Sequence, residues 1–208
     1  MIIKNIKHNN IIFDLDGTII DSSKSIISSL NFSLNSNNIK PKIELNSFLI
    51  GPPLKNTFIK LTGISSDRIL NKLILDFKTH YDEYSYRDSS IYPGLLSAIK
   101  YQLMMKKNIY LATNKRKYPT IKILKHLNIN KIFKKIYTID MNISNFSEKK
   151  FMISSLIKNE KLDKSSTIYV GDRTEDGIAS KFNKIDFLMV PWGYSENRWI
   201  KYLNEITL

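Results

Sequence analysis

Short apolar runs separated by helix-like patterns make up most of the chain. Five runs are rich in Ile, Val, Tyr or Phe and are nearly continuous rather than alternating. Runs of this kind are typical of strands that are buried on both faces, as in a parallel sheet. The expected strands are residues 10–14, 108–113, 135–140, 167–172 and 187–191.

Helical spacing of apolar residues recurs between these runs. Pro93-Gly94 precedes one such segment, Pro119 stands where the first turn of a second would begin, and a third starts near Lys149. Strands and helices therefore alternate from about residue 90 onward. This alternation predicts an α/β fold with a doubly wound, Rossmann-like parallel sheet.

The stretch from Asp21 to Tyr92 differs from the rest of the chain. It shows helical periodicity without a convincing strand, and Gly51-Pro52-Pro53 interrupts it near the middle. We interpret it as an inserted all-helical cap domain, with the catalytic core formed by residues 1–20 and 90–208 and the cap by residues 21–89. The alternative is that these helices belong to one compact domain.

The composition is that of an ordinary globular protein. The chain has 208 residues, of which 42% are hydrophobic, and it contains no cysteine. Disulfides, thiolate catalysis and Cys-ligated metal sites are therefore excluded. No apolar run reaches the roughly 18 residues of a membrane span, and the first residues lack the apolar core of a secretory signal. We expect a cytoplasmic protein.

The net charge needs a separate interpretation. It is formally +13 at pH 7, and 27 of the 32 basic residues are lysines spread along the whole chain. A basic chain can indicate nucleic acid or an anionic membrane as a partner. Asn and Ile are also abundant, which points to an AT-rich coding sequence, and Arg, which base recognition favours, is scarce. We therefore expect a solvated lysine-rich surface that attracts an anionic small molecule, and neither a nucleic acid nor a membrane partner.

Polar side chains follow three of the expected strands. In an open parallel sheet, ligands bind outside the carboxyl ends of the strands. The first strand ends in Asp14, with Asp16 two residues later, and the fourth ends in Asp172, with Asp176 four residues later; each pair stands next to a glycine. The second strand ends in Thr113-Asn114-Lys115, and the pair Lys149-Lys150 stands at the start of a helix.

Each of these features is weak alone, but their order is specific. The series DxDGT, Thr-Asn, Lys and GDxxxD resembles the haloacid dehalogenase superfamily of Mg²⁺-dependent phosphohydrolases. The phosphoglycolate-phosphatase-like branch, with a helical cap inserted after the first motif, is the most similar, and the resemblance covers essentially the whole chain. Further matches are Ile50-Gly51-Pro52-Pro53-Leu54, Tyr92-Pro93-Gly94 and Trp192-Gly193-Tyr194.

The acidic residues also indicate a metal by their charge. Four carboxylates in one site repel one another unless they share a cation. Oxygen ligands without His or Cys favour a hard ion, Mg²⁺ before others. The resemblance implies that the carboxylates of Asp14 and Asp172 and the backbone carbonyl of Asp16 hold this ion. Asp176 would hold a metal-bound water or orient the other ligands.

The resemblance also implies catalytic roles. Asp14 is the expected nucleophile, which forms an aspartyl-phosphate, and Asp16 is the expected general acid and base. Thr113 and the backbone N–H groups of Leu15 and Asn114 are expected to bind the transferring oxygens. The lysine that balances the phosphate charge is Lys149 or Lys150, and we favour Lys149.

Other residues have weaker or purely structural interpretations. Lys55, Lys115 and Arg173 are candidate substrate selectors. Asp172 could instead be a helix N-cap, which would explain only one of the acids. Two positions depart from the family pattern: Asn183 replaces a frequent glycine, and no proline follows the lysine motif, which weakens phosphoglycolate as the substrate. His8, His80 and His126 have no metal-ligand spacing and are expected on the surface or in packing.

We therefore expect a Mg²⁺-dependent phosphomonoester hydrolase that acts on a small soluble metabolite. A phosphomutase that uses the same core is an alternative. A more remote alternative is a basic binding protein on an inactive phosphatase scaffold. The particular metabolite and the oligomeric state are not predicted.

Overall fold

The computed structural model describes residues 2–141, 146 and 148–194. The contacts divide the chain into two compact units. One unit combines Met1–Asp21 with Ser90–Leu208, and the other is Ser22–Ser89. We call them the α/β unit and the helical unit and describe each by itself.

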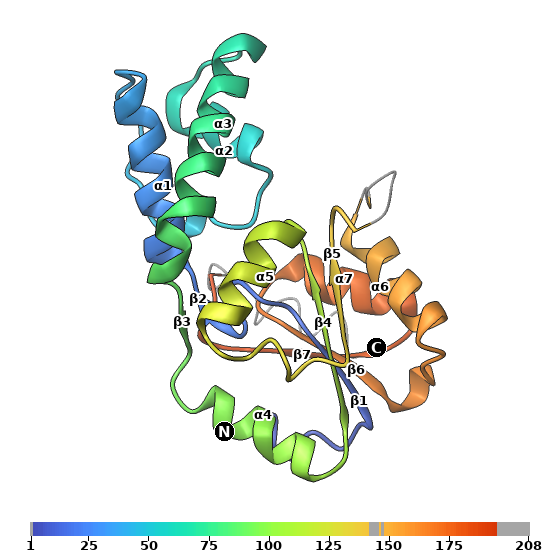
Figure 1. The fold of residues 1–208 in the computed structure, drawn as a ribbon. Helices are drawn as coiled ribbons and strands as arrows, with labels where there is room; N and C mark the ends of the chain where they lie inside the picture. Colours follow the sequence, from blue (N-terminus) through green and yellow to red (C-terminus); the bar gives the residue numbers. More distant parts are fainter. Residues whose placement is uncertain (1, 142–145, 147, 195–208) are drawn as a thin grey trace. The chain divides into compact units, whose positions relative to one another are not determined.

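A five-stranded parallel sheet forms the centre of the α/β unit (Figure 1). Its order is β5-β4-β1-β6-β7, and every neighbouring pair is parallel. Continuous apolar runs suit these strands because the middle of the sheet is covered on both faces. The prediction of a doubly wound parallel sheet is confirmed. The strands are β1 (Asn10–Phe13), β4 (Asn108–Thr113), β5 (Lys135–Thr138), β6 (Thr167–Gly171) and β7 (Asp186–Met189).

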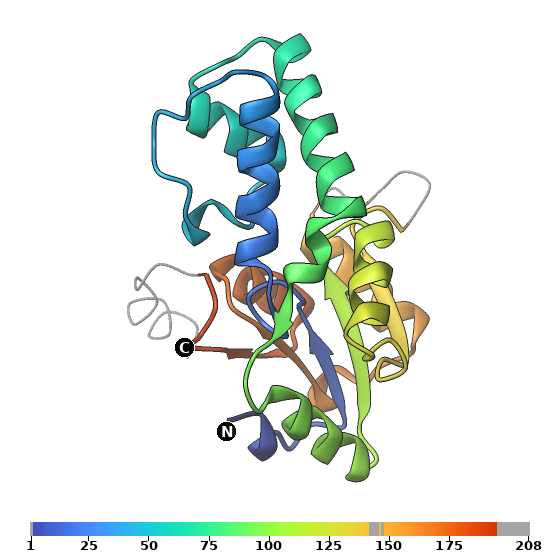
Figure 2. The same ribbon diagram turned by 60° about the vertical axis from the view of Figure 1, so that its left-hand side comes forward.

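Helices cover both faces of this sheet (Figures 1 and 2). The chain steps outward from β1 to β4 and β5 and then returns to β6 and β7 on the other side of β1. Because such crossovers are right-handed, α4 and α5 cover one face and α6 and α7 the other. The helices are α4 (Leu95–Met104), α5 (Lys117–His126), α6 (Lys149–Asn159) and α7 (Thr174–Asn183), with the 3-10 turns η1 (Ile2–Asn5) and η4 (Lys164–Ser166).

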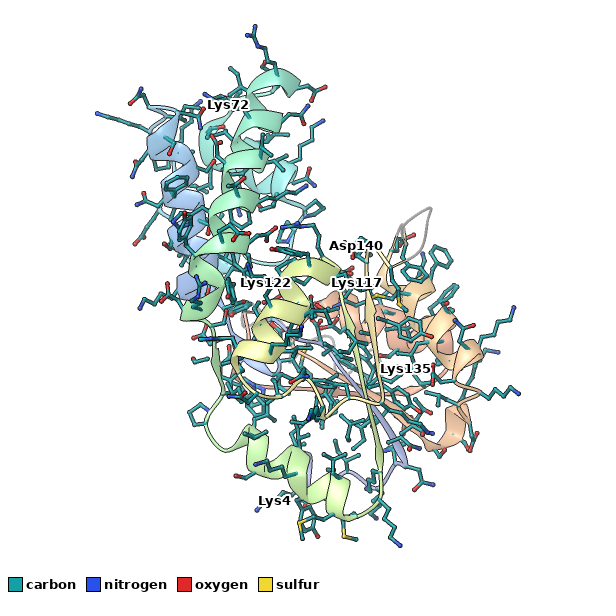
Figure 3. The ribbon with its side chains drawn as sticks, in the orientation of Figure 1. Lys4, Lys72, Lys117, Lys122, Lys135 and Asp140 are labelled. Atoms are coloured by element: carbon teal, nitrogen blue, oxygen red, sulfur yellow. The ribbon has the colours of Figure 1, made fainter. Side chains whose placement is uncertain are left out.

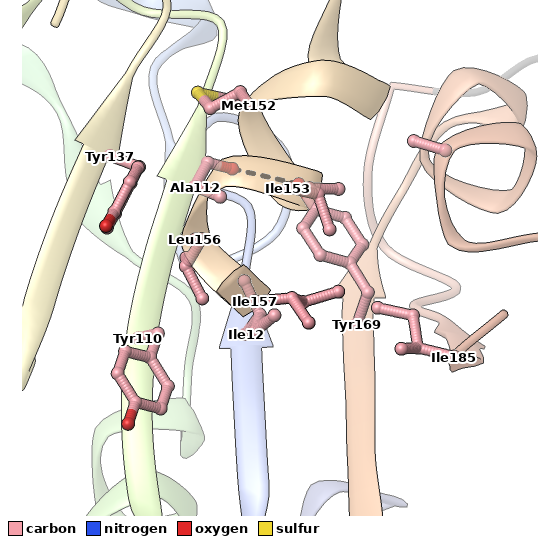
Figure 4. Packing of buried hydrophobic residues seen from close by; sticks show 11 residues of the cluster. Ile12, Tyr110, Ala112, Tyr137, Met152, Ile153, Leu156, Ile157, Tyr169 and Ile185 are labelled. Carbon is pink, nitrogen blue, oxygen red and sulfur yellow. Dashed lines mark hydrogen bonds between the residues drawn. The ribbon is translucent and has the colours of Figure 1, made fainter. Parts of the chain in front are cut away.

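The core beneath α6 and α7 contains several large side chains (Figure 4). Tyr110 and Tyr169 are almost completely buried, and the α6 residues Met152 and Leu156 belong to the same cluster. The Tyr169 hydroxyl donates a hydrogen bond to the backbone carbonyl of Ala112 at 2.9 Å, so its polar group is satisfied inside the core. Burial of this face fixes α6 against the sheet, and with it the position of the first turn of α6.

Two short strands that we did not predict lie at the points where the chain leaves and re-enters the α/β unit. They are β2 (Ile20–Asp21) and β3 (Ser90–Ile91), which pair antiparallel. The expectation that residues 21–92 contain no strand is therefore wrong at both ends. Two residues are too few to show an alternating pattern, and the partners are brought together only by the fold.

The helical unit is built around the pairing of α1 (Ser23–Ser36) with α3 (Asp67–Glu83). Leu30 and Leu34 of α1 and Leu73 of α3 are fully buried. Gly63 ends α2 (Leu54–Thr62) in the left-handed conformation that favours glycine. The unit is completed by α2, which follows Gly51-Pro52-Pro53, and by the turns η2 (Ser47–Leu49) and η3 (Ser85–Asp88).

Lysines lie on many elements of both units, as Figure 3 illustrates. The labelled examples are on η1 (Lys4), on α5 (Lys117 and Lys122), on β5 (Lys135) and on α3 (Lys72). The labelled lysines therefore do not belong to one element or to one unit. None of the helices in the described part of the chain combines the length and the apolar composition that a membrane-spanning segment requires.

Candidate active site

The site begins where the central strand β1 ends. β1 lies between β4 and β6, so the residues that follow these three strands emerge next to one another. Asp14 directly follows β1, and its backbone N–H donates to the carbonyl of Val170 in β6 at 2.9 Å. The next residues form a tight turn in which the Leu15 carbonyl accepts backbone N–H groups, and Gly17 has a φ of +79°.

Three aspartates meet at this edge of the sheet. Asp14, Asp172 and Asp176 each offer a carboxylate oxygen, and these oxygens lie within 4.8 Å of one another. All three residues are buried. The structure therefore brings together two residues from the ends of neighbouring strands and one from the first turn of a helix.

Asp176 is held by the backbone at the start of α7. Its Oδ2 accepts the N–H of Asp172 at 3.1 Å and that of Arg173 at 2.9 Å. A carboxylate in the first helical turn satisfies N–H groups that lack helical partners. Arg173 is the N-cap of α7, and Asp172 stands one residue before it. The interpretation of Asp172 as a helix N-cap is therefore wrong.

Lys149 supplies a positive charge to this cluster. It is the first residue of α6, and its side chain is only 3% exposed. Its Nζ lies 3.0 Å from Oδ2 of Asp14 and 2.6 Å from Oδ1 of Asp176. Lys150 instead pairs with Glu148 at 3.0 Å and lies over the rings of Phe151 and Phe182. Of the two candidate lysines, the structure places Lys149 beside the aspartates.

Burial and mutual repulsion change the acidity of these groups. Burial raises the pKa of Asp14 from 3.8 to about 7, although Lys149 acts in the opposite direction. Burial, and next the charge of Asp176, raise the pKa of Asp172 to about 6. Burial alone would lower the pKa of Lys149, but Asp14 and Asp176 outweigh it and hold this pKa well above its usual value. One ammonium group therefore does not fully compensate three carboxylates.

These residues fit a divalent cation. No hydrogen-bond donor among the described residues reaches Oδ1 of Asp14, although this oxygen is buried. A buried carboxylate oxygen without a partner is costly, and a cation would satisfy it. The donors are carboxylate oxygens, which hard ions such as Mg²⁺ prefer. Asp14 and Asp172 are the residues whose side chains would hold such an ion, with Asp176 next to them.

Asp16 lies apart from this cluster. Its two carboxylate oxygens each lie 3.0 Å from Nζ of Lys115, which follows β4. Both side chains are mostly buried. The side chain of Asp16 is therefore not a member of the three-aspartate cluster, and its expected contribution to a metal is through its backbone carbonyl, which stays a prediction. Lys115, which we expected to bind substrate, is paired with Asp16, the expected general acid and base.

Thr113 and Asn114 stand at the end of β4. Phe13 of β1 is paired with Leu111 of β4, so Thr113 lies two residues further along, beyond the end of β1. The Thr113 hydroxyl is buried and accepts the backbone N–H of Lys115 at 3.2 Å. The Asn114 amide donates to Glu175 in the first turn of α7 at 3.1 Å. Their roles toward phosphate remain predictions.

The remaining candidates have structural partners. Lys55, in the helical unit, pairs with Asp67 at 2.8 Å on the surface. His8 lies 2.7 Å from Asp186, and His80 lies 3.0 Å from the Ser29 hydroxyl. Asn183, inside the last turn of α7, donates to the Lys150 carbonyl at 2.9 Å. The left-handed residue after α7 is Lys184, so the glycine-like position lies one residue later than Asn183.

Two contacts of Asp172 were not anticipated from the sequence. The Thr18 hydroxyl donates to Oδ1 at 3.2 Å, and the backbone N–H of Tyr194 donates to Oδ2 at 2.8 Å. Both residues belong to motifs that match the family, DxDGT and Trp-Gly-Tyr. Both motifs therefore contain a residue that contacts the site, but nothing in the sequence indicated that the two segments meet at Asp172.

The fold and the site define a class of protein. The family model for haloacid dehalogenase-like hydrolases matches residues 11–190. The chain belongs to this family, and the resemblance inferred from the motifs is confirmed.

Three relatives show the range of activities among similar proteins. The tyrosine-protein kinase PtkA of Mycobacterium tuberculosis is 26% identical over 191 residues, which are 91% of this chain and 64% of PtkA. The chain thus spans less than two thirds of the length of that relative. A solved structure of PtkA has a TM-score of 0.78 and covers 91% of this chain and 87% of the solved chain, at 25% identity.

The other two relatives match over more of their length. A 5'-nucleotidase of Pseudomonas aeruginosa is 24% identical over 190 residues, which are 91% of this chain and 85% of that protein. A phosphoglycolate phosphatase of Agrobacterium fabrum is 24% identical over 190 residues, which are 89% of this chain and 81% of that protein.

Proposed function

We propose that the protein is a Mg²⁺-dependent phosphomonoester hydrolase that acts on a small soluble metabolite through an aspartyl-phosphate. The observation that carries this proposal is the buried cluster of Asp14, Asp172 and Asp176 around Lys149, in which Oδ1 of Asp14 has no donor among the described residues. Two relatives named as a nucleotidase and a phosphoglycolate phosphatase support the reaction type.

In the first half-reaction, a carboxylate oxygen of Asp14 attacks phosphorus while the bond to the leaving oxygen breaks. Asp16 donates a proton to the departing oxygen, so an alcohol leaves and an aspartyl-phosphate remains. In the second half-reaction, Asp16 takes a proton from a water molecule that attacks the same phosphorus. Inorganic phosphate leaves, and Asp14 is regenerated as a carboxylate.

Several groups of the chain stabilise this transfer. A Mg²⁺ ion bound by Asp14 and Asp172 would offset the repulsion between the anionic nucleophile and the anionic phosphate. Lys149 adds positive charge beside the nucleophile. The hydroxyl of Thr113 and the N–H groups of Leu15 and Asn114 donate to the transferring oxygens. Lys115 holds the Asp16 carboxylate in one orientation.

The proposed catalytic core is residues 1–20 and 90–208, and the proposed cap inserted into it is residues 21–89. The helical unit, Ser22–Ser89, is this cap without Asp21, which belongs to the α/β unit. The chain enters and leaves it through the paired strands β2 and β3, so both connections are made at one place. A cap excludes water and selects the substrate. Arg173, at the N-cap of α7, and Lys55, in the helical unit, are candidate selectors. We propose a cytoplasmic location, in line with the absence of cysteine.

The direct test is release of inorganic phosphate from a generic aryl phosphate, followed by a panel of phosphorylated metabolites. The panel contains phosphoglycolate, nucleoside monophosphates and sugar phosphates. We expect release with Mg²⁺ and none with EDTA. Isomerisation of a hexose 1-phosphate without net phosphate release would indicate a phosphomutase instead. No turnover of any compound with Mg²⁺, together with salt-dependent binding to DNA or RNA, would indicate a binding protein.

A further inference from the structure

Tyr194 connects the proposed metal ligand Asp172 to the strand pair β2/β3. We propose that Tyr194 is a positioning residue, whose hydroxyl anchors to Asp21 the turn that holds the Asp172 carboxylate. This inference rests on the proposed Mg²⁺ site. The consequence is that the integrity of the strand pair β2/β3, where the chain leaves and re-enters the α/β unit, affects how tightly this unit binds the ion.

The Asp172 carboxylate is held at both oxygens. The backbone N–H of Tyr194 donates to Oδ2 at 2.8 Å, and the Thr18 hydroxyl donates to Oδ1 at 3.2 Å. Asp172 is completely buried. Donors on both sides of a carboxylate fix its rotation, which decides where its remaining lone pairs point.

Two glycines allow the backbone to approach this carboxylate closely. A Cβ atom on Gly193 would lie 2.2 Å from Cβ of Asp172, and one on Gly17 would lie 2.4 Å from its Oδ2. Both distances are far below normal contact. Gly193 does not have a positive φ, so close approach, rather than backbone conformation, explains the glycine there.

The turn at residues 192–194 is itself anchored through both of its aromatic side chains. The Trp192 indole N–H donates to the backbone carbonyl of Thr18 at 3.1 Å. The Tyr194 hydroxyl donates to Oδ1 of Asp21 at 3.0 Å, and Tyr194 is only 6% exposed. Asp21 is the last residue of β2 and is paired with Ser90 of β3. Tyr194 thus connects Asp172 to the strand pair, because its backbone N–H binds Asp172 and its buried side chain binds Asp21 of β2.

This arrangement separates two functions within one residue. The backbone N–H of Tyr194 binds the Asp172 carboxylate, whereas its hydroxyl donates to Asp21 and is also in hydrogen-bond contact with Tyr92, which follows β3. Removal of the hydroxyl leaves the N–H donor in place but frees the turn that carries it. Substitution of a residue that holds a metal ligand in place typically lowers metal affinity by about 10- to 100-fold.

The test is calorimetric titration of the whole protein with Mg²⁺, without substrate. We expect Tyr194→Phe to weaken binding roughly tenfold. Tyr101→Phe, a half-exposed tyrosine on α4, is the matched control and should bind as the unchanged protein does. Asp21→Asn keeps an oxygen that can accept the Tyr194 hydroxyl, while Asp21→Ala removes it. Both variants lose the charge, so weaker binding by the alanine variant alone isolates the hydrogen bond.

The outcomes separate this inference from the proposed function. If the unchanged protein does not bind Mg²⁺, the metal site and this inference both fail. If it binds Mg²⁺ and Tyr194→Phe binds equally well, only the positioning role of Tyr194 is overturned. A variant with a lower Tm but unchanged Mg²⁺ affinity would show that the hydroxyl serves stability alone.

Discussion

The ammonium group of Lys149 lies 3.0 Å from Oδ2 of Asp14, with both side chains buried at the end of the central strand. The same ammonium group contacts Asp176 at 2.6 Å. One lysine therefore forms ion pairs with the residue that follows β1 and with a residue in the first turn of α7. Removal of this lysine would leave two buried carboxylates without the positive charge of its ammonium group.

We expect Lys149→Met to lower the free energy of unfolding of the metal-free protein by about 3 kcal/mol, because breaking a buried ion pair leaves uncompensated charge. Phosphate release should also be lost. Lys150→Met is the matched control. Lys150 is partly exposed and pairs with Glu148, so its removal should cost less than about 1 kcal/mol. Urea unfolding in EDTA measures both variants. Equal effects of the two substitutions would contradict the assignment of Lys149.

We expect Asp14→Asn to reduce phosphate release by at least about 10⁴-fold, because the amide cannot form the aspartyl-phosphate. The fold should survive, since Lys149 keeps its contact with Asp176. Turnover of an aryl phosphate and circular dichroism give the two readouts. Substantial activity in a folded variant would refute Asp14 as the nucleophile.

The stability of the metal-free protein should depend on pH. The pKa values of Asp14 and Asp172 are raised from 3.8 to about 7 and about 6. The folded protein therefore holds protons that the unfolded chain has released, and stability falls as the pH rises from about 4 to about 7. Mg²⁺ must displace these protons, so its stabilising effect should grow over the same range.

Thermal unfolding in EDTA and in Mg²⁺ across this range measures the effect. Asp14→Asn should give a flatter profile in EDTA, because it removes one of the two titrating carboxyls. A Tm in EDTA that rises from about pH 5 to about pH 7 would contradict the raised pKa values.

We expect Gly193→Ala to weaken Mg²⁺ binding more than tenfold and to cost about 1–3 kcal/mol of stability, because the new methyl group collides with Asp172. Gly63→Ala is the control. Gly63 has a φ of +71° and ends α2 in the helical unit, so its substitution should lower stability without changing metal affinity. Calorimetric titration with Mg²⁺ compares the variants. A matching loss of affinity in Gly63→Ala would indicate a general effect of instability.

We expect Lys115→Met to lower kcat roughly tenfold, because Asp16 loses the ammonium group that contacts both of its oxygens. Lys117→Met is the matched control. Lys117 lies two residues further on and is exposed, and its backbone bond to Asp140 does not involve the side chain. In steady-state kinetics on an aryl phosphate, the kcat of Lys117→Met should stay within about twofold of that of the unchanged protein. A selective rise in KM in Lys115→Met would indicate substrate binding rather than positioning of Asp16.

Local patterns in the sequence were enough to predict the sheet and to indicate which polar residues stand at the ends of its strands. The apolar runs before Asp14, Thr113 and Asp172 predict buried parallel strands, and parallel strands bring their carboxyl ends to one edge. The spacing of Asp172 and Asp176 places the second acid in the first turn of a helix. These are short-range relationships, so they can be read from neighbouring residues.

The tertiary structure decided the contacts between distant segments. The pairing of β2 with β3 joins residues about 70 positions apart, and neither strand is long enough to show a pattern. The contacts of Lys115 with Asp16 and of Tyr194 with Asp172 depend on the strand order and on the path of each loop. Lys149 and Lys150 are neighbours of the same type, and only the packing of α6 on the sheet buries one beside the aspartates while the other faces Glu148. The sequence thus determined which chemical groups stand at the strand ends. The fold determined how they are paired, because pairing depends on which distant backbone lies close enough to reach them.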